Sequence, residues 1–303
     1  MTALRALATA CVLLATLALA ACSREATGPE AQAPARPALW RVADADTTIY
    51  LFGSIHMLPP GASWRSDPVE RALAESRAVY FEADVEGDPA TMASLVERLG
   101  RLPASETLSG GLSAEQSSAL GVVAARLGIS RPALETMRPW YAAVVISDAA
   151  IRSAGYGSDA GVDAELRADA EAAGKEVRFL ETVEQQLSAL ATLPADVQLA
   201  YLELTLAEAG DVAAPLAEMT RAWREGDTDT LARVLIEEDM ARLPALEHAL
   251  LTRRNAVWAD EIDQLLDTET GTLFITVGAA HLVGDASVIT DLTARGRGVT
   301  RTQ

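Results

Sequence analysis

The sequence predicts an α/β fold in which a central mixed β-sheet is flanked by helices, with long helical insertions between strands. Short apolar runs bounded by Gly, Pro or Asp recur along the chain, and such runs are typical of buried strands. Two long stretches of helical pattern, at residues 88–172 and 183–266, separate them. Strands that alternate with helices in this way favour an α/β sheet over an all-helical bundle.

The elements are expected in a definite order. Strands are predicted at residues 39–42, 48–56, 78–84, 176–180, 273–277 and 299–301. Helices are predicted at residues 67–76, through most of 88–172 and 183–266, and at 286–294. Ser113 and Gln116 have the spacing of a capping box, and Arg138-Pro139 is expected to begin a long apolar helix.

The N-terminal region predicts export and lipid anchoring. Residues 1–21 combine a single cationic residue, Arg5, with an apolar run too short for a comfortable membrane span, which is typical of a signal peptide. Leu19-Ala-Ala-Cys22 has the form of a bacterial lipobox, so we expect Cys22 to be lipidated. Residues 22–38 are predicted as a flexible linker and 39–303 as a single α/β domain in the bacterial cell envelope. It would face the periplasm, with the outer membrane weakly preferred because Ser23 follows the cysteine.

Composition excludes several classes of function. The formal net charge is −18, and an acidic surface does not suit nucleic acid, which is bound through basic patches. The two cysteines are Cys11 and Cys22, so the expected mature domain has neither a disulfide nor a thiol nucleophile. The chain also lacks a Gly-x-Ser-x-Gly elbow, a phosphate-binding glycine loop and a His-Glu-x-x-His motif.

Two matching units carry the candidate site. One strand pattern runs into Gly53-Ser-Ile-His56, and another, near the end of the chain, runs into Gly278-Ala-Ala-His281. Glycine allows a sharp turn as the chain leaves the sheet, so Gly53 and Gly278 are expected to place both imidazoles at the C-terminal edge of the strands. Open α/β sheets bind ligands at that edge. A single Gly-x-x-His is more often a capping or core histidine, but two of the chain's three histidines occur in this pattern.

Acidic residues at other strand ends would complete a metal site. Neutral imidazole is the commonest metal ligand, and a carboxylate often joins it while one position stays open for water. Glu82 is the first candidate for third ligand or general base, with Asp84 on the same strand face as the alternate and Glu181 at the end of a further strand. Such a set supports hydrolysis by a metal-activated water, and it equally suits a non-haem iron oxygenase. The third histidine, His248, is expected to be a surface or packing residue of a helix at 243–266.

The chain resembles the TraB/GumN family, relatives of the Tiki metalloproteases and, more distantly, of the ChaN haem-binding and erythromycin-esterase-like proteins. The stretches that carry the resemblance lie in order along residues 39–303: Leu51-Phe-Gly-Ser-Ile-His-Met-Leu-Pro-Pro-Gly61, Tyr80-Phe-Glu-Ala-Asp84, Arg138-Pro-Trp140, Gly161-Val-Asp-Ala-Glu165, Gly174-Lys175, Leu180-Glu-Thr-Val-Glu184-Gln185, Arg253-Arg-Asn255 and Val277-Gly-Ala-Ala-His-Leu-Val-Gly284.

The resemblance implies a function and roles for particular residues. Tiki-like members are taken to cleave peptides with a divalent metal, manganese or cobalt rather than zinc or iron. The implied ligands are His56, His281 and Glu82, and Glu181, Arg254 and Asn255 would support them or the peptide substrate. The alternatives from other classes are a lipoprotein that binds haem or another ligand in the same cleft without turnover, and a metal-free esterase that uses His56 as base.

Overall fold

The computed structural model describes residues 34–303, which form one compact unit. The predictions for the signal peptide, for lipidation at Cys22 and for most of the linker fall on residues 1–33, outside the described residues. Residues 34–38, which the sequence assigns to the linker, contact the domain: Ala35 and Ala38 are buried, and the Arg36 N–H donates to the Arg224 carbonyl oxygen.

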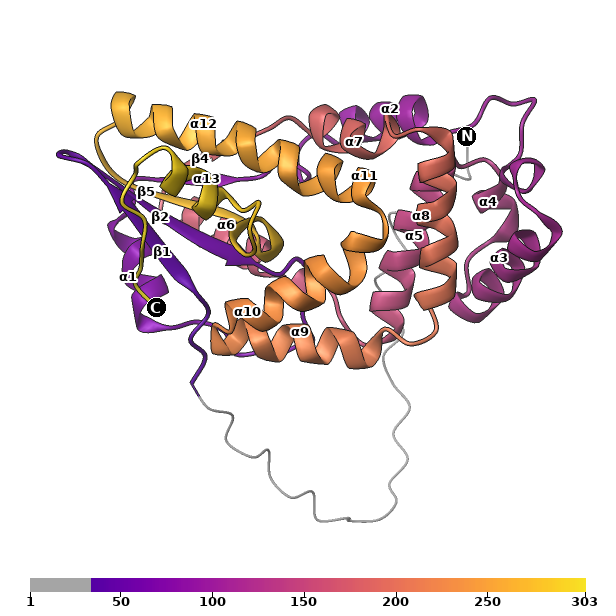
Figure 1. Ribbon diagram of the computed structural model, residues 1–303, viewed down its shortest axis with the longest axis horizontal. Helices are drawn as coiled ribbons and strands as arrows, with labels where there is room; N and C mark the ends of the chain where they lie inside the picture. Colours follow the sequence, from indigo (N-terminus) through magenta and orange to yellow (C-terminus); the bar gives the residue numbers. More distant parts are fainter. Residues whose placement is uncertain (1–33) are drawn as a thin grey trace, which may run out of the picture. The chain divides into compact units, whose positions relative to one another are not determined.

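A six-stranded mixed sheet lies at the centre of the described unit, so the predicted α/β class is confirmed (Figure 1). The strand order is β4-β3-β5-β2-β1-β6; β4, β3, β5 and β2 are parallel, and β1 pairs antiparallel with β2 and β6. The strands are β1 (Leu39–Ala43), β2 (Thr47–Ser54), β3 (Ala78–Phe81), β4 (Glu176–Phe179), β5 (Gly271–Gly278) and β6 (Thr300–Arg301).

The helices fill the connections that the sequence marks as helical. They are α1 (Asp67–Glu75), α2 (Pro89–Gly100), α3 (Ala114–Leu127), α4 (Arg131–Glu135), α5 (Pro139–Ser153), α6 (Val162–Ala172), α7 (Val183–Ala191), α8 (Ala195–Glu208), α9 (Ala213–Glu225), α10 (Thr228–Ala232), α11 (Pro244–Glu247), α12 (Arg253–Thr268) and α13 (Val288–Ala294). Short 3₁₀ or π segments are η1 (Leu108–Gly111), η2 (Ser158–Ala160), η3 (Arg233–Asp239), η4 (Met240–Arg242), η5 (His248–Thr252) and η6 (Ala279–Leu282). The Ser113–Gln116 capping box is confirmed.

Helices cover both faces of the sheet. On one face α6 contacts β3 and β4, and Phe52 packs against Trp64, Trp223 and Phe274 with ring centroids 5.8–6.4 Å apart. On the other face α12 and α13 contact each other, and α12 contacts β2. Since the strands are buried on both faces, their near-continuous apolar sequence is explained.

The long helical insertions build a second hydrophobic cluster beside the sheet. Residues from α3, α5 and α8 form its centre, and Figure 1 shows these helices grouped at one side of the strands. Leu120, Ile146 and Leu202 are its most enclosed members from the three helices. No helix within residues 34–303 is long and apolar enough to cross a membrane.

Two predicted elements differ from the observed ones. β3 ends at Phe81, so Asp84 lies in a turn, where its carbonyl oxygen accepts from the Gly87 N–H, and the predicted shared strand face of Glu82 and Asp84 is wrong. The helix predicted at 243–266 is divided by the π-helical segment η5. His248 is exposed within that segment, in agreement with its predicted surface role.

Candidate active site

Strand register brings the two Gly-x-x-His units together. β2 and β5 are parallel neighbours in which Gly53 pairs with Val277 and Ser54 with Gly278, so both chains leave the sheet at the same edge. β3 lies on the other side of β5 and ends just before Glu82. His56, Glu82 and His281 therefore follow three adjacent strands, at the edge where open α/β sheets bind ligands.

The glycines of both units provide space rather than a special backbone angle. Neither has positive φ; Gly53 belongs to β2 and Gly278 is the last residue of β5. A Cβ on Gly53 would lie 3.0 Å from the Ala279 Cα, tighter than nearly all real contacts. A Cβ on Gly278 would lie 3.3 Å from both Glu82 Oε1 and His56 Nε2, and 3.6 Å from His281 Cδ2. The missing side chain of Gly278 leaves room among the three functional groups, and that of Gly53 lets Ala279 approach β2.

His56 is held at the rim of the site by a carboxylate. Its side chain is 61% exposed, and its Nδ1 lies 2.7 Å from Asp163 Oδ2 on α6. Desolvation of the ring by the surrounding atoms acts to lower its pKa, but the charge and hydrogen bond of Asp163, together with the charge of Glu82, raise the pKa to about 9. The Asp163 contact fixes the ring and leaves Nε2 toward the space above Gly278.

Glu82 is the buried carboxylate at the centre of the site. Its Oε1 accepts from the Gly278 N–H at 2.7 Å, and its Oε2 accepts from Arg254 at 2.6 Å and from Gln186 Nε2 at 3.1 Å. Burial acts to raise its pKa, whereas His281, His56, Arg254 and the Gly278 N–H lower it to about 2. The group is therefore ionised at neutral pH.

His281 is buried, neutral and fixed in one tautomer. Burial lowers its pKa to about 3 despite the nearby Glu82 carboxylate, whose Oε1 is 3.6 Å from Nε2. Asn255 Nδ2 donates to the Ala286 carbonyl oxygen, so Asn255 Oδ1 accepts the proton of His281 Nδ1 at 2.6 Å. The Nε2 lone pair then faces the site, and Trp258 packs against the ring with a centroid separation of 4.5 Å.

Arg254 links the buried acids to His281. Its guanidinium donates to Glu181 Oε1 at 2.7 Å as well as to Glu82, and its Nη1 lies 3.1 Å from His281 Nε2. The same Nη1 donates to the carbonyl oxygen of Leu250 in η5 at 2.9 Å. Single π turns often occur at functional sites, and this one ends two residues before Arg254.

The donor set suits a divalent metal by its chemistry. His56 Nε2, Glu82 Oε1 and the Cδ2 edge of the His281 ring border a single space above Gly278, and His281 Nε2 lies 3.6 Å from Glu82 Oε1. Each histidine has its Nδ1 held by an oxygen, the arrangement typical of metal ligands. Within residues 34–303, however, no three His, Cys, Asp or Glu side chains are grouped closely enough to hold an ion. Arg254 also occupies the lone pair of His281 Nε2. The residue types fit a metal, and the packing shown does not gather them around one.

The remaining predicted residues divide between this cleft and its surroundings. Glu181, Arg254 and Asn255 belong to the buried network, whereas Asp84 pairs with Arg167 at 2.6 Å. Asp84 lines a separate groove rather than the cleft of about 270 Å³ beside His56 and Glu82.

Three site residues were not assigned a role from sequence. Asp163 stands in the Gly161-Val-Asp163 stretch, so that motif offered a signal for it. Trp258 follows Arg254 by four residues on α12, and helical spacing places both side chains on one face, with the guanidinium carbon 4.4 Å from the ring centroid. Gln186, on α7, carries no comparable signal.

The approach of Gly161 to His56 yields a stability prediction. An added Cβ at Gly161 would fall well under 3.0 Å from the His56 carbonyl oxygen, a backbone atom that cannot move aside easily. Gly161→Ala is therefore expected to lower the free energy of unfolding by about 3 kcal/mol and to disturb the His56–Asp163 pair. Gly157→Ala is the control, because nothing lies within 4 Å of its added Cβ. Equal urea midpoints for the two variants would refute this account.

Comparison with known proteins now identifies the family. The model of the TraB/PrgY/gumN family matches residues 38–301, nearly the whole described unit. The chain belongs to the TraB/PrgY/gumN family.

One curated relative is similar to this family member over most of its length. The zebrafish (Danio rerio) protein Metalloprotease TIKI1 is 26% identical over 320 residues, covering 87% of this chain and 63% of the relative. The chain thus spans less than two thirds of that protein's length. No solved structure shows significant similarity to the chain.

Proposed function

We propose that this family member is a divalent-metal-dependent peptidase in which His56, His281 and Glu82 hold the metal. The observation that carries the proposal is the convergence of these side chains at the ends of three adjacent strands, with both imidazoles oriented through Nδ1. Similarity to a metalloprotease supports the reaction class. When bound, the metal would lower the pKa of a water molecule and polarise the peptide carbonyl group.

The protein residues have separate tasks in this proposal. Asp163 and Asn255 hold the two rings through Nδ1, which leaves His56 Nε2 at the space above Gly278 and His281 Nε2 beside Glu82 Oε1. Glu82 supplies a carboxylate that stays ionised at neutral pH. Arg254, positioned by Glu181, is the nearest cation to the site and would stabilise negative charge that develops on the peptide carbonyl oxygen.

The alternatives are separated from this proposal by the size of the cleft or by experiment. The cleft beside His56 encloses about 270 Å³, at or below the lower end for drug-sized ligands, which argues against haem. A metal-free esterase that uses His56 as base would keep its full activity in chelator, so chelator treatment separates it from the proposed peptidase. An iron oxygenase uses the same ligand types, so metal content and reaction products must separate it from a peptidase.

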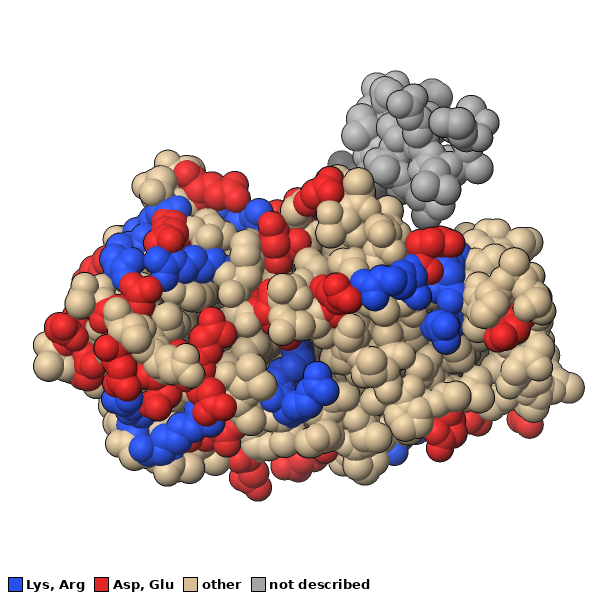
Figure 2. Space-filling view, turned by 90° about the horizontal axis from the view of Figure 1, so that it is seen from above, with Lys and Arg blue, Asp and Glu red and all other residues tan. Residues whose placement is uncertain are grey.

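The proposal also includes the identity of the metal and the location of the protein in the cell. Manganese or cobalt is preferred over zinc or iron, on the strength of the Tiki resemblance. The lipobox before Cys22 supports anchoring to the bacterial envelope with the site facing the periplasm. Acidic and basic side chains are interspersed over the face in Figure 2, without an extended basic patch for anionic lipid or nucleic acid.

The proposal is tested by metal content and cleavage measured together. The purified chain is analysed for manganese, cobalt, zinc and iron, and is incubated with a library of quenched fluorescent peptides before and after treatment with chelator. We expect about one metal ion per chain and cleavage that chelator stops and added metal restores. Cleavage that continues at full rate in chelator, or no metal after reconstitution, would overturn it.

Asn255 provides a narrower prediction about metal affinity. Asn255→Ala removes the acceptor that fixes the His281 tautomer, and loss of such a partner typically weakens metal binding by about 10- to 100-fold. Competition with a fluorescent chelator measures the change. Gln264→Ala, an exposed amide on the same helix, is the control and should leave the affinity unchanged. Similar affinities for the two variants would show that Asn255 does not orient the ring.

A further inference from the structure

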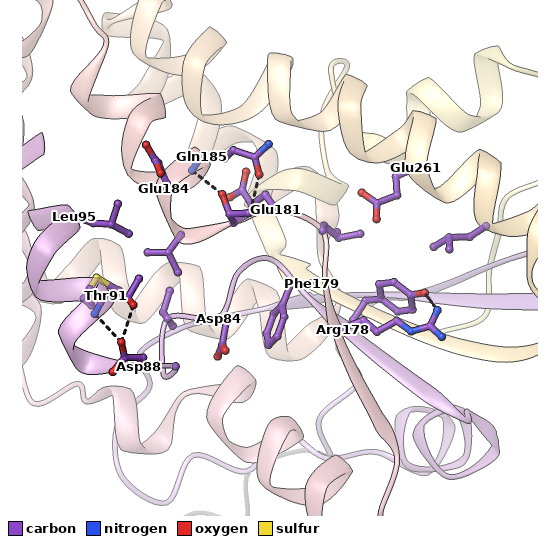
Figure 3. A pocket seen from close by; sticks show the side chains of 18 residues that line it. Asp84, Asp88, Thr91, Leu95, Arg178, Phe179, Glu181, Glu184, Gln185 and Glu261 are labelled. Atoms are coloured by element: carbon purple, nitrogen blue, oxygen red, sulfur yellow. Dashed lines mark hydrogen bonds between the residues drawn. The ribbon is translucent and has the colours of Figure 1, made fainter. Parts of the chain in front are cut away.

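A groove of about 970 Å³ follows the open edge of the sheet next to the candidate active site. Figure 3 shows its walls, which come from α2, β4, the start of α7 and α12. Its volume is at the upper end of the range for ligand pockets. The groove is distinct from the cleft that contains His56 and Glu82, and Val85, which is 55% exposed, lines both. A ligand in the groove can therefore extend past Val85 toward the histidines.

The backbone of β4 is available for pairing along this groove. β4 is an edge strand whose hydrogen-bonded neighbour is β3. Glu176 N–H donates to Arg77 and Leu180 N–H to Phe81, so the alternation of a parallel ladder turns the N–H and C=O groups of Val177 and Phe179 outward. Extended peptides commonly bind proteins by adding a strand to such an edge.

One charged side chain in the groove lacks a partner. Most charged groups of the wall are already paired: Asp84 with Arg167, Glu181 with Arg254, Glu184 with Arg98, and Arg178 with Glu176 and Glu269. Glu261, on α12, makes no hydrogen bond or ion pair with any side chain of residues 34–303, and burial raises its pKa. In Figure 3 its side chain extends away from the α12 ribbon, and its carboxylate lies above Arg178 and to the right of Glu181. A cationic group on a bound ligand would neutralise the unpaired carboxylate of Glu261.

We propose that this groove binds the peptide substrate as an extended strand added to β4, with a lysine or arginine side chain against Glu261. The inference rests on the proposed peptidase function and specifies its substrate class. Pairing with Val177 and Phe179 would guide the main chain toward Glu181 and Val85, and from there the peptide reaches the cleft of His56. The backbone would supply affinity and Glu261 the preference for a basic residue.

Binding is measured without turnover, so that this inference can fail separately from the peptidase proposal. The wild-type chain in chelator is titrated into fluorescein-labelled ten-residue peptides, in which a single lysine or its uncharged analogue norleucine occupies each position in turn. We expect the lysine peptide to bind about tenfold more tightly at one position. Glu261→Gln should abolish that difference, whereas Asp260→Asn, a charge removal on the exposed face of the same helix, should preserve it.

Scanning the peptide with N-methyl amides tests the strand pairing without altering the protein. Methylation should weaken binding at alternate positions, because every second N–H of an added strand faces β4. Equal binding of lysine and norleucine peptides, no effect of Glu261→Gln, or N-methyl effects without alternation would overturn the inference. Metal-dependent cleavage without a preference for basic residues would contradict the groove and leave the peptidase standing. Selective binding of the lysine peptide without cleavage under any metal would support the groove as a peptide site and overturn the peptidase proposal.

Discussion

Replacement of His281 by alanine is expected to abolish metal binding and to lower kcat/KM for peptide cleavage by about a thousandfold or more. The side chain contributes the Nε2 that lies 3.6 Å from Glu82 Oε1. Among residues 34–303 the third imidazole, His248, cannot replace it, because it is exposed on η5. Metal content per chain and initial cleavage rates measure the two effects. His248→Ala is the matched control and should behave as wild type in both assays.

His56→Ala should lose metal to the same extent but differ in stability. The His56 side chain is 61% exposed, so its removal should lower the free energy of unfolding by about 1 kcal/mol or less. Removal of the buried His281 side chain leaves a cavity beside Trp258 and an unpaired Asn255 oxygen, and should lower the free energy of unfolding by about 2–4 kcal/mol. If the His56→Ala and His281→Ala variants lose metal equally but differ in stability, the loss of metal cannot be attributed to unfolding. A metal-containing, active His281→Ala variant would refute the proposed ligand set.

The sheet and the pairing of the two histidine units could be predicted from local patterns. Each strand is a short apolar run with clear boundaries. Parallel β2 and β5 bring His56 and His281 to one edge because each histidine lies three residues after its glycine, and the two glycines are one position apart in register. Glu82 was predictable for the same reason, since it directly follows β3. These features depend on short-range periodicity and on a general rule for where parallel strands end.

Other parts of the site depend on tertiary packing that no local pattern encodes. The end of β3 at Phe81, which removes Asp84 from the strand, depends on a turn closed by Gly87 and on the pairing of Asp84 with Arg167 from a distant helix. The π turn before Arg254 could not be predicted either, because the apolar pattern of this stretch predicts one continuous helix. The space that Gly278 leaves between three side chains is likewise evident only once those side chains are placed.

Arg254 is the residue on which the buried charges depend most. It pairs with both Glu82 and Glu181, whose side chains are each 8% exposed. Arg254→Met retains much of the side-chain volume but leaves two buried carboxylates without their cation, and breaking such a pair typically costs about 3–5 kcal/mol. Chemical denaturation at pH 7 measures the loss. Arg253→Met, an exposed neighbour, is the control and should change stability by no more than about 0.5 kcal/mol.

The dependence of this loss on pH identifies its cause. Burial already raises the pKa of Glu181 while Arg254 opposes that rise, so removal of Arg254 should raise the pKa further. A carboxyl group whose pKa is higher in the folded than in the unfolded state binds more protons when folded, and the stability it confers falls as pH increases. Arg254→Met should therefore be more destabilised at pH 8 than at pH 5, and adding Glu181→Gln should reduce the difference. If the loss were the same at both pH values, packing around Trp258 rather than charge would be the contribution of Arg254, because its guanidinium also lies over that ring.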